Sequence, residues 1–331
     1  MSSSEFSRNF GRRDLFKQAA GVIAGSAIAG LGKAQAQASA PAAGSTLHFF
    51  PSGFKPLKFQ TSTGVTINGV VGGQGPPLLL LHGAPLSHIS WRLTAPELAK
   101  QYTVVATDLR GYGDSGKPAD GENHSNYSKR AMALDQVEVM HSFGFDKFPV
   151  VGHDRGGRVA HRMTLDHPDK VTKVTVLDIV PTYYIYTHVT IGFVQAYFHW
   201  FNYLRAAPGP ENQLKEEIEA AAPRMTSEAD VEYLRLRRDP ANIHGMCEDY
   251  RAGASIDLEH DKADLDKKIH VPFLCLYAQK GPMARLYDVP AIWKERAANV
   301  KGKLLSGGHN LMEDVPGEVL AELQPFLNSP V

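Results

Sequence analysis

Short apolar runs alternate with helical patterns along most of the chain. Successive apolar positions in several of these runs are typical of strands buried on both faces of a parallel sheet. Helical stretches such as residues 126–144 lie between the runs. This alternation predicts an α/β fold with a mostly parallel, doubly wound sheet. The predicted strands are residues 64–71, 77–83, 103–111, 148–154, 173–180, 272–278 and 303–308.

The alternation stops after Asp178, where a long helical and aromatic segment begins. Helical patterns cover residues 194–204, 211–222 and 228–238. An insertion at this point predicts a helical cap over the carboxyl ends of the strands, where open α/β sheets bind ligands. We therefore expect a core of residues 47–180 and 271–331, and a cap of residues 181–270.

The N-terminal residues follow a different pattern. Arg12 and Arg13 precede an apolar stretch at 19–31, and alanines at 34, 36 and 38 offer cleavage sites. This is typical of a twin-arginine signal peptide, and the apolar stretch is too short to span a bilayer. We expect residues 1–38 to be a signal, 39–46 a linker, and the mature protein to be periplasmic or secreted without a membrane anchor. The alternative is a disordered extension or a misassigned start.

Composition narrows the range of partners. Lys and Arg number 35, Asp and Glu also 35, and no basic block occurs. These features argue against nucleic acid as a partner. Cys247 and Cys275 have no metal-type spacing and do not require a disulfide. Without a Walker loop or dinucleotide fingerprint, we predict no cofactor, no metal and a small-molecule substrate. The sequence leaves open whether the protein forms a homodimer.

The segment GHDRG, residues 152–156, has the spacing of a nucleophile elbow with aspartate in place of serine. It follows a predicted strand and opens a helix, as an elbow requires. Gly152 and Gly156 allow a tight turn. Alone, Asp154 would be interpreted as a helix N-cap. Together with the residues below, it is predicted to be the nucleophile.

Three further segments complete a catalytic set. His309 follows the last predicted strand and fits the chain order nucleophile, acid, histidine. Asp178 ends a strand at the same sheet edge and is the preferred partner of His309, with Asp288 as the alternative. The backbone N–H groups of Ala84 and Arg155 are the expected oxyanion-hole donors.

Arg155 and Arg158 lie three positions apart on the helix behind Asp154. Two guanidinium groups can hold a carboxylate bidentately and offset its repulsion from Asp154. The alternative is pairing with surface acids. His199 and Trp200 lie in the aromatic stripe AYFHWFNY, whose periodicity alone favours core packing.

With these residues identified, the chain resembles α/β-hydrolases of the Asp-nucleophile group, and most of all haloacetate dehalogenases, including the fluoroacetate-cleaving type. The matching motifs are the H-G-x-P loop, G-H-D-R-G with a second Arg, V-L-D-I-x-P-T at 176–182, H-W at 199–200, M-C-E-D-Y-R-A-G at 246–253, and the late G-H. The resemblance implies that Asp154 forms an ester with the substrate and that His199, Trp200 and Tyr233 bind the departing halide. Tyr233 is placed by its spacing to Asp239-Pro240. The family often has an aromatic residue where this chain has Ala84.

Two other functions are kept as hypotheses. Epoxide hydrolysis would use the same nucleophile with two cap tyrosines as acids, drawn from Tyr183, Tyr184, Tyr186 and Tyr233; the adjacent arginines argue against it. A non-catalytic binder of small carboxylates is the third hypothesis, and a complete nucleophile, acid and base argue against that.

Overall fold

The structure is a computed structural model, and it describes residues 46–330. The predicted signal peptide, residues 1–38, and the predicted linker, apart from Thr46, lie outside the described residues. Within residues 46–330, no helix is long and apolar enough to cross a membrane.

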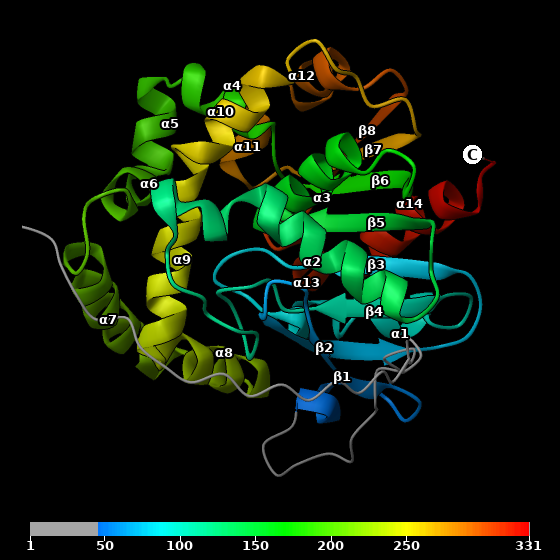
Figure 1. Cartoon of the computed structure of the whole chain (residues 1–331), viewed down its shortest axis with the longest axis horizontal. Helices are drawn as coiled ribbons and strands as arrows, with labels where there is room; N and C mark the ends of the chain where they lie inside the picture. The colour runs from blue at the N-terminus through cyan, green and yellow to red at the C-terminus, as the bar shows by residue number, and fades with distance from the viewer. Residues whose placement is uncertain (1–45, 331) are drawn as a thin grey trace, which may run out of the picture. The chain divides into compact units, whose positions relative to one another are not determined.

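Eight strands form one sheet within the described residues, in the order β1-β2-β4-β3-β5-β6-β7-β8 (Figure 1). Strands β3 to β8 pair in parallel, and β2 pairs antiparallel with β1 and β4. The predicted mostly parallel, doubly wound sheet is confirmed. The strands are β1 (Lys55–Gln60), β2 (Thr66–Gly72), β3 (Pro77–Leu81), β4 (Thr103–Thr107), β5 (Phe148–His153), β6 (Val171–Leu177), β7 (Phe273–Ala278) and β8 (Val300–Leu305).

The strand register brings three predicted site segments to one level. Leu81 of β3 pairs with Gly152 of β5, and His153 of β5 pairs with Leu177 of β6. Because these strands are parallel, the residues that follow them emerge together at the carboxyl edge of the sheet. Ala84, Asp154 and Asp178 therefore meet there.

Helices cover both faces of the sheet, which explains why the strands are apolar at successive positions. Leu79 and Leu81 pack in the cluster that includes residues of α2, α3 and α12, whereas Leu78 and Leu80 pack in the cluster with α1, α13 and α14. Both cysteines are free and buried. The helices of the core are α1 (Ala95–Leu98), α2 (Lys129–Ser142), α3 (Asp154–Asp166), α11 (Pro282–Leu286), α12 (Val289–Arg296), α13 (Leu311–Asp314) and α14 (Pro316–Asn328), with 3-10 turns η1 (Thr46–Phe49), η2 (His88–Trp91) and η3 (Glu122–Tyr127).

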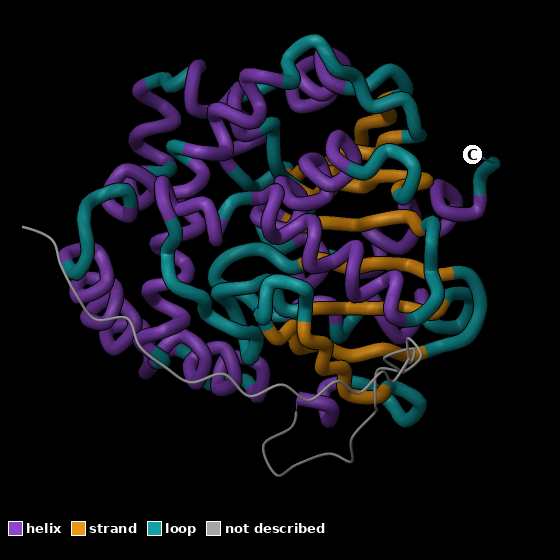
Figure 2. Tube along the Cα trace, viewed as in Figure 1, coloured by secondary structure: helices purple, strands orange, loops and turns teal. Residues whose placement is uncertain are grey.

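The segment between β6 and β7, all of it described, contains seven α-helices and one 3-10 turn. Figure 2 shows helices of this segment gathered beyond one end of the strands. The expected helix over 194–204 is two helices, because the backbone leaves the helical conformation at Tyr197. The elements are α4 (Thr182–Thr187), α5 (Ile191–Ala196), α6 (Phe198–Tyr203), α7 (Gly209–Ala221), η4 (Ala222–Arg224), α8 (Glu228–Arg238), α9 (Pro240–Gly253) and α10 (Ile256–Ala263).

Candidate active site

Asp154 occupies a strained turn between β5 and α3. Its φ is +43°, in the left-handed region that non-glycine residues rarely adopt. A Cβ on Gly152 would lie 2.3 Å from the carbonyl oxygen of Gly156, and one on Gly156 would lie 2.4 Å from that of Leu81. Both positions therefore require glycine.

The side chain of Asp154 does not cap its own helix. The N-cap of α3 is His153, which makes no side-chain cap hydrogen bond. Instead, the backbone N–H of Ala84 donates to Oδ2 of Asp154 over 3.1 Å. The N-cap interpretation therefore fails, and one expected oxyanion-hole donor already points at the carboxylate.

Asp178 and His309 form a close pair at the same edge. Asp178 has a φ of +52° directly after β6. Its Oδ1 accepts a hydrogen bond from the backbone N–H of Ala278 over 2.9 Å, and its Oδ2 lies 2.7 Å from Nδ1 of His309. Asp288 instead caps α12 by accepting from the N–H of Ala291. The structure thus brings His309 to Asp178 and not to the alternative.

The electrostatics of the set suit a carboxylate nucleophile. Burial acts to raise the pKa of Asp154, but the charges of His309 and Arg155 outweigh it and hold that pKa well below its usual range. Burial acts to lower the pKa of His309, but its hydrogen bond to Asp178 and the charge of Asp154 raise it overall. Asp154 is therefore ionised at neutral pH, the form a nucleophile needs.

Two further histidines support these loops. Nε2 of His82 accepts from the backbone N–H of Leu109 over 3.0 Å, and its Nδ1 lies 2.8 Å from the carbonyl of Gly83. Nε2 of His153 donates to the carbonyl oxygen of His309 over 2.9 Å. Burial lowers the pKa of His153 to about 3, so the ring is neutral. The sequence did not single out His153.

Arg155 is fully buried, and no acid among the described residues lies within hydrogen-bond distance of it. None of its three side-chain nitrogens has a hydrogen-bond partner among the described residues. The nearest carboxylate, Asp249, lies 3.8 Å from its Nε. Asp249 is itself engaged by Lys129 and by the hydroxyl of Tyr112, which donates over 2.5 Å. The guanidinium instead lies over Tyr250, 3.5 Å from the ring centre.

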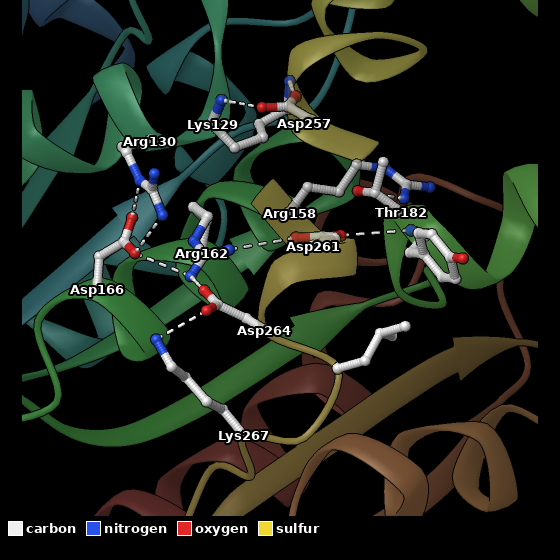
Figure 3. Close-up of polar contacts among 12 residues, drawn as sticks. Lys129, Arg130, Arg158, Arg162, Asp166, Thr182, Asp257, Asp261, Asp264 and Lys267 are labelled. Atoms are coloured by element: carbon white, nitrogen blue, oxygen red, sulfur yellow. Dashed lines mark hydrogen bonds and ion pairs between the residues drawn. The ribbon is translucent and has the colours of Figure 1, made fainter. Parts of the chain in front are cut away.

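Arg158 lies beside Arg155 and forms no ion pair within the part of the chain that the structure describes. It donates to the carbonyl of Val180 over 3.1 Å and to Oγ1 of Thr182 over 3.2 Å, while its Nε is unpartnered (Figure 3). Burial and the charge of Arg155 lower its pKa. Neither arginine pairs with a surface acid, so the alternative interpretation fails. Their open donors suit an incoming carboxylate.

Trp200 of α6 lies against both arginines. The guanidinium carbons of Arg155 and Arg158 lie 4.9 and 5.0 Å from its ring centre. His199, next in the chain, has its ring centre 6.3 Å from that of Tyr250. The structure therefore brings Trp200 to the arginines and His199 to the neighbouring Tyr250, and the aromatic stripe is more than core packing.

Tyr233, which was predicted to bind the halide, is not brought to this group by the structure. Its hydroxyl donates to Oε1 of Glu313 over 2.9 Å, and Glu313 also pairs with Arg92. The tyrosine that does lie at the site is Tyr250, whose ring centre is 5.5 Å from that of Trp200. Tyr250 is the tyrosine of the MCEDYRAG motif, so the signal was present in the sequence.

Two more tyrosines were not fully anticipated. The hydroxyls of Tyr186 and Tyr197 are buried without hydrogen-bond partners in residues 46–330. Their ring centres lie 5.5 and 5.6 Å from that of Trp200. Tyr186 was named as a cap tyrosine, whereas Tyr197 was not singled out.

A cavity of about 120 Å³ adjoins these residues. Ala84, His199 and Tyr250 line it on the side of the catalytic set. Its other lining residues are Pro85, Leu86, Tyr112, Gly113, Tyr203, Leu214, Ile218, Leu236, Arg237, Asn242, Ile243 and Met246.

One group of three metal-type ligands occurs in the described chain, formed by Asp120, His244 and Glu248. His244 is already hydrogen-bonded to Asp120 over 2.8 Å and to Glu211 over 3.1 Å. Arg251 pairs with both Glu211 and Glu248. This cation and the engaged histidine favour a structural network over a metal site.

Comparison with known proteins agrees with this geometry. A family model described as alpha/beta hydrolase fold matches residues 76–316. A fluoroacetate dehalogenase from Burkholderia sp. is 45% identical over 276 residues, covering 80% of this chain and 91% of the relative. A soluble epoxide hydrolase from Corynebacterium sp. (strain C12) is 34% identical, covering 78% and 92%. The crystal structure of ALR0039 from Nostoc sp. PCC 7120 aligns with a TM-score of 0.80 at 46% identity, covering 84% and 99%.

Proposed function

Because this chain belongs to the α/β-hydrolase-fold family, we propose that it is a hydrolase of carbon–halogen bonds that converts short 2-halo acids, haloacetate first, to 2-hydroxy acids and halide. The observation that carries the proposal is Arg155, a buried guanidinium without a hydrogen-bond partner beside an ionised Asp154. An anionic substrate supplies the missing partner. The similarity to a fluoroacetate dehalogenase supports the same assignment.

The first step is displacement at the α-carbon. A carboxylate oxygen of Asp154 attacks that carbon, the carbon–halogen bond breaks, and halide leaves with the bonding electron pair. An ester then joins Asp154 to the former substrate. Repulsion between substrate and nucleophile at about 4 Å is roughly 1 kcal/mol in water and about 4 kcal/mol at an effective dielectric of about 20. Arg155 and Arg158 offset this repulsion by holding the substrate carboxylate.

The halide leaves into the aromatic side of the site. Trp200 and His199 supply N–H donors, and Tyr250 supplies an O–H donor, which suit a small anion. Tyr250 takes the place in this set that the sequence had given to Tyr233. The neighbouring guanidinium groups add positive charge where the halide develops negative charge.

The second step hydrolyses the ester. His309 takes a proton from water, and the resulting hydroxide attacks the carbonyl carbon of the Asp154 ester. The N–H of Ala84, with that of Arg155, stabilises the oxyanion. The ester C–O bond then breaks, and the leaving alkoxide takes the proton that His309 holds, which gives the hydroxy acid and neutral His309. Asp154, left as a carboxylic acid, releases its proton to solvent and is regenerated as a carboxylate. Asp178 stabilises the protonated His309 meanwhile.

Epoxide hydrolysis is the second candidate, and one observation favours it. The unpartnered hydroxyls of Tyr186 and Tyr197 could protonate an opening epoxide oxygen. Relatives named as epoxide hydrolases are 34 to 36% identical. Against it, a neutral epoxide would offer no charged acceptor to the guanidinium N–H groups of Arg155, which have no hydrogen-bond partner among the described residues.

Halide release from chloroacetate and fluoroacetate by the purified protein tests the proposal. We expect release by the wild type and a loss of about 10⁴-fold or more in Asp154→Asn. His309→Ala should instead release one halide per enzyme and accumulate the ester, visible as a mass increase of the intact protein. Absence of halide release from both acids by the wild type, with turnover of an epoxide such as styrene oxide, would replace this proposal with the second candidate.

A further inference from the structure

The cavity beside the catalytic set is larger than a haloacetate requires. Arg155, Arg158 and the aromatic donors already account for the carboxylate and halogen of such a substrate. The cavity measures about 120 Å³, whereas about 10–15 Å³ holds one water. Most of its far wall is aliphatic, from Leu214 and Ile218 of α7, Leu236 of α8, and Ile243 and Met246 of α9.

Ala84 connects this cavity to the reacting atoms. Its N–H donates to Asp154, and the same residue lines the cavity. Its methyl side chain leaves the junction open, where a large aromatic side chain would fill it. His199 and Tyr250 line the cavity as well, so the cavity borders the aromatic side of the catalytic set.

Resting on the proposed function, we propose that the cavity is a chain-binding site for 2-halo acids whose carbon chain continues beyond the α-carbon. With the carboxylate on the arginines and the halogen on the aromatic donors, the chain and a hydrogen are the two remaining substituents of the α-carbon, and the enantiomer decides which position the chain takes. Directed past Ala84, it enters the aliphatic part of the cavity. Each methylene buried there should raise kcat/KM about three- to fourfold.

Arg237 of α8 adds a positive charge to the cavity wall, which favours a substrate chain that ends in a negative charge. It is the only lysine or arginine among the residues that line the cavity, all of which are described. It forms no ion pair within residues 46–330, and its one hydrogen bond is to Sδ of Met225 at 3.9 Å. A second carboxylate at the end of the substrate chain would pair with it. The preferred class is therefore a 2-halo dicarboxylic acid.

The test compares halide release from chloroacetate, both enantiomers of 2-chlorohexanoate, and 2-chlorohexanedioate. Ile218→Phe fills the cavity from its far wall. We expect it to lower kcat/KM for the accepted 2-chlorohexanoate enantiomer about tenfold or more and to leave chloroacetate within about twofold. Leu214→Phe should act alike, which guards against a folding defect in one variant. Arg237→Met should lower kcat/KM about tenfold for 2-chlorohexanedioate alone.

Other results would overturn the proposal. An equal loss for chloroacetate and 2-chlorohexanoate in properly folded Ile218→Phe and Leu214→Phe would make the cavity only an entry path. Chloroacetate turnover without turnover of either longer acid would leave the cavity without a chain-binding role. An unchanged preference in Arg237→Met would remove the second carboxylate from the class. Lack of chloroacetate turnover by the wild type would instead refute the proposed function itself.

Discussion

Arg155 and Arg162 lie two turns apart on α3, and both are almost completely buried, yet their surroundings are opposite. Arg162 donates to Asp166 over 2.8 Å, pairs with Asp264, and reaches Asp261 at 3.5 Å (Figure 3). Arg155 has no hydrogen-bond partner within residues 46–330, and its nearest carboxylate lies 3.8 Å away. Burying a charge without hydrogen bonds is costly, so a site that keeps one is prepared for a ligand of opposite charge.

The ion pairs of Arg162 have a structural role that the surroundings of Arg155 do not have. Asp261 lies in α10 and Asp264 directly follows it, whereas Arg162 belongs to the helix that carries Asp154. Asp261 also accepts from the backbone N–H of Tyr183 over 3.3 Å, next to the Thr182 that holds Arg158. The Arg162 network therefore fixes the cap to the core, and Arg155 is left for the substrate.

The largest expected effect comes from replacing Arg155, because this change should impair substrate binding without lowering stability. Arg155→Met should lower kcat/KM for chloroacetate about 10³-fold, or about 4 kcal/mol, because a buried charged contact to the substrate is lost. The free energy of unfolding should not fall, since no native ion pair of hydrogen-bond length is broken. Halide release and urea unfolding of one preparation measure both. A marked loss of stability would show that Arg155 is structural.

Arg162→Met is the matched control and should give the reverse pattern. Removing this guanidinium leaves the buried carboxylate of Asp261 without its ion pair, although Asp166 keeps Arg130 and Asp264 keeps Lys267. The free energy of unfolding should therefore fall by about 3 kcal/mol. Folded molecules should retain kcat/KM for chloroacetate within several-fold, because Arg162 does not face the substrate. Equal losses of activity per folded molecule in both arginine variants would show that Arg155 is no more involved in substrate binding than Arg162.

Binding of acetate, which is not turned over, should distinguish Arg155 from Arg162 through protein stability alone. Acetate bound to the arginine pair stabilises only the folded state, so a concentration ten times its Kd adds about 1.4 kcal/mol to the free energy of unfolding. The gain should vanish in Arg155→Met and persist in Arg162→Met. Thermal unfolding at constant ionic strength, with sulfate salts for balance, measures it. Equal stabilisation of all three proteins would indicate a general salt effect.

The core of the site could be predicted from sequence because sheet geometry leaves few choices. Ala84, Asp154 and Asp178 each follow a buried strand, and parallel pairing brings strand ends to one edge. Strand β1 escaped prediction because it is a polar edge strand, with Lys55, Lys58 and Gln60 among its six residues. Its apolar signal is correspondingly weak.

The cap was harder to predict because helix spacing alone does not say which face meets the substrate. Helix α9 is buried over most of its length, so burial could not single out Tyr250 from its neighbours. Tyr233 was chosen by its distance in sequence from Asp239, yet the two tyrosines belong to different helices with different contacts. Only the packing of α6 and α9 against Arg155 resolves the choice.

The smallest expected effect concerns His309, whose charge depends on the nucleophile beside it. The hydrogen bond to Asp178 and then the charge of Asp154 raise the pKa of His309 above 6.5, despite burial. Asp154→Asn removes one of these two negative charges, so the pKa of His309 should fall relative to the wild type while the Asp178 contact persists. Ester formation neutralises Asp154 in the same way, which frees His309 to act as a base at lower pH in the intermediate than in the free enzyme. NMR titration of the His309 ring in both proteins measures the difference. An unchanged pKa would mean that Asp178 alone sets the charge of His309 and that the ester does not activate its own hydrolysis.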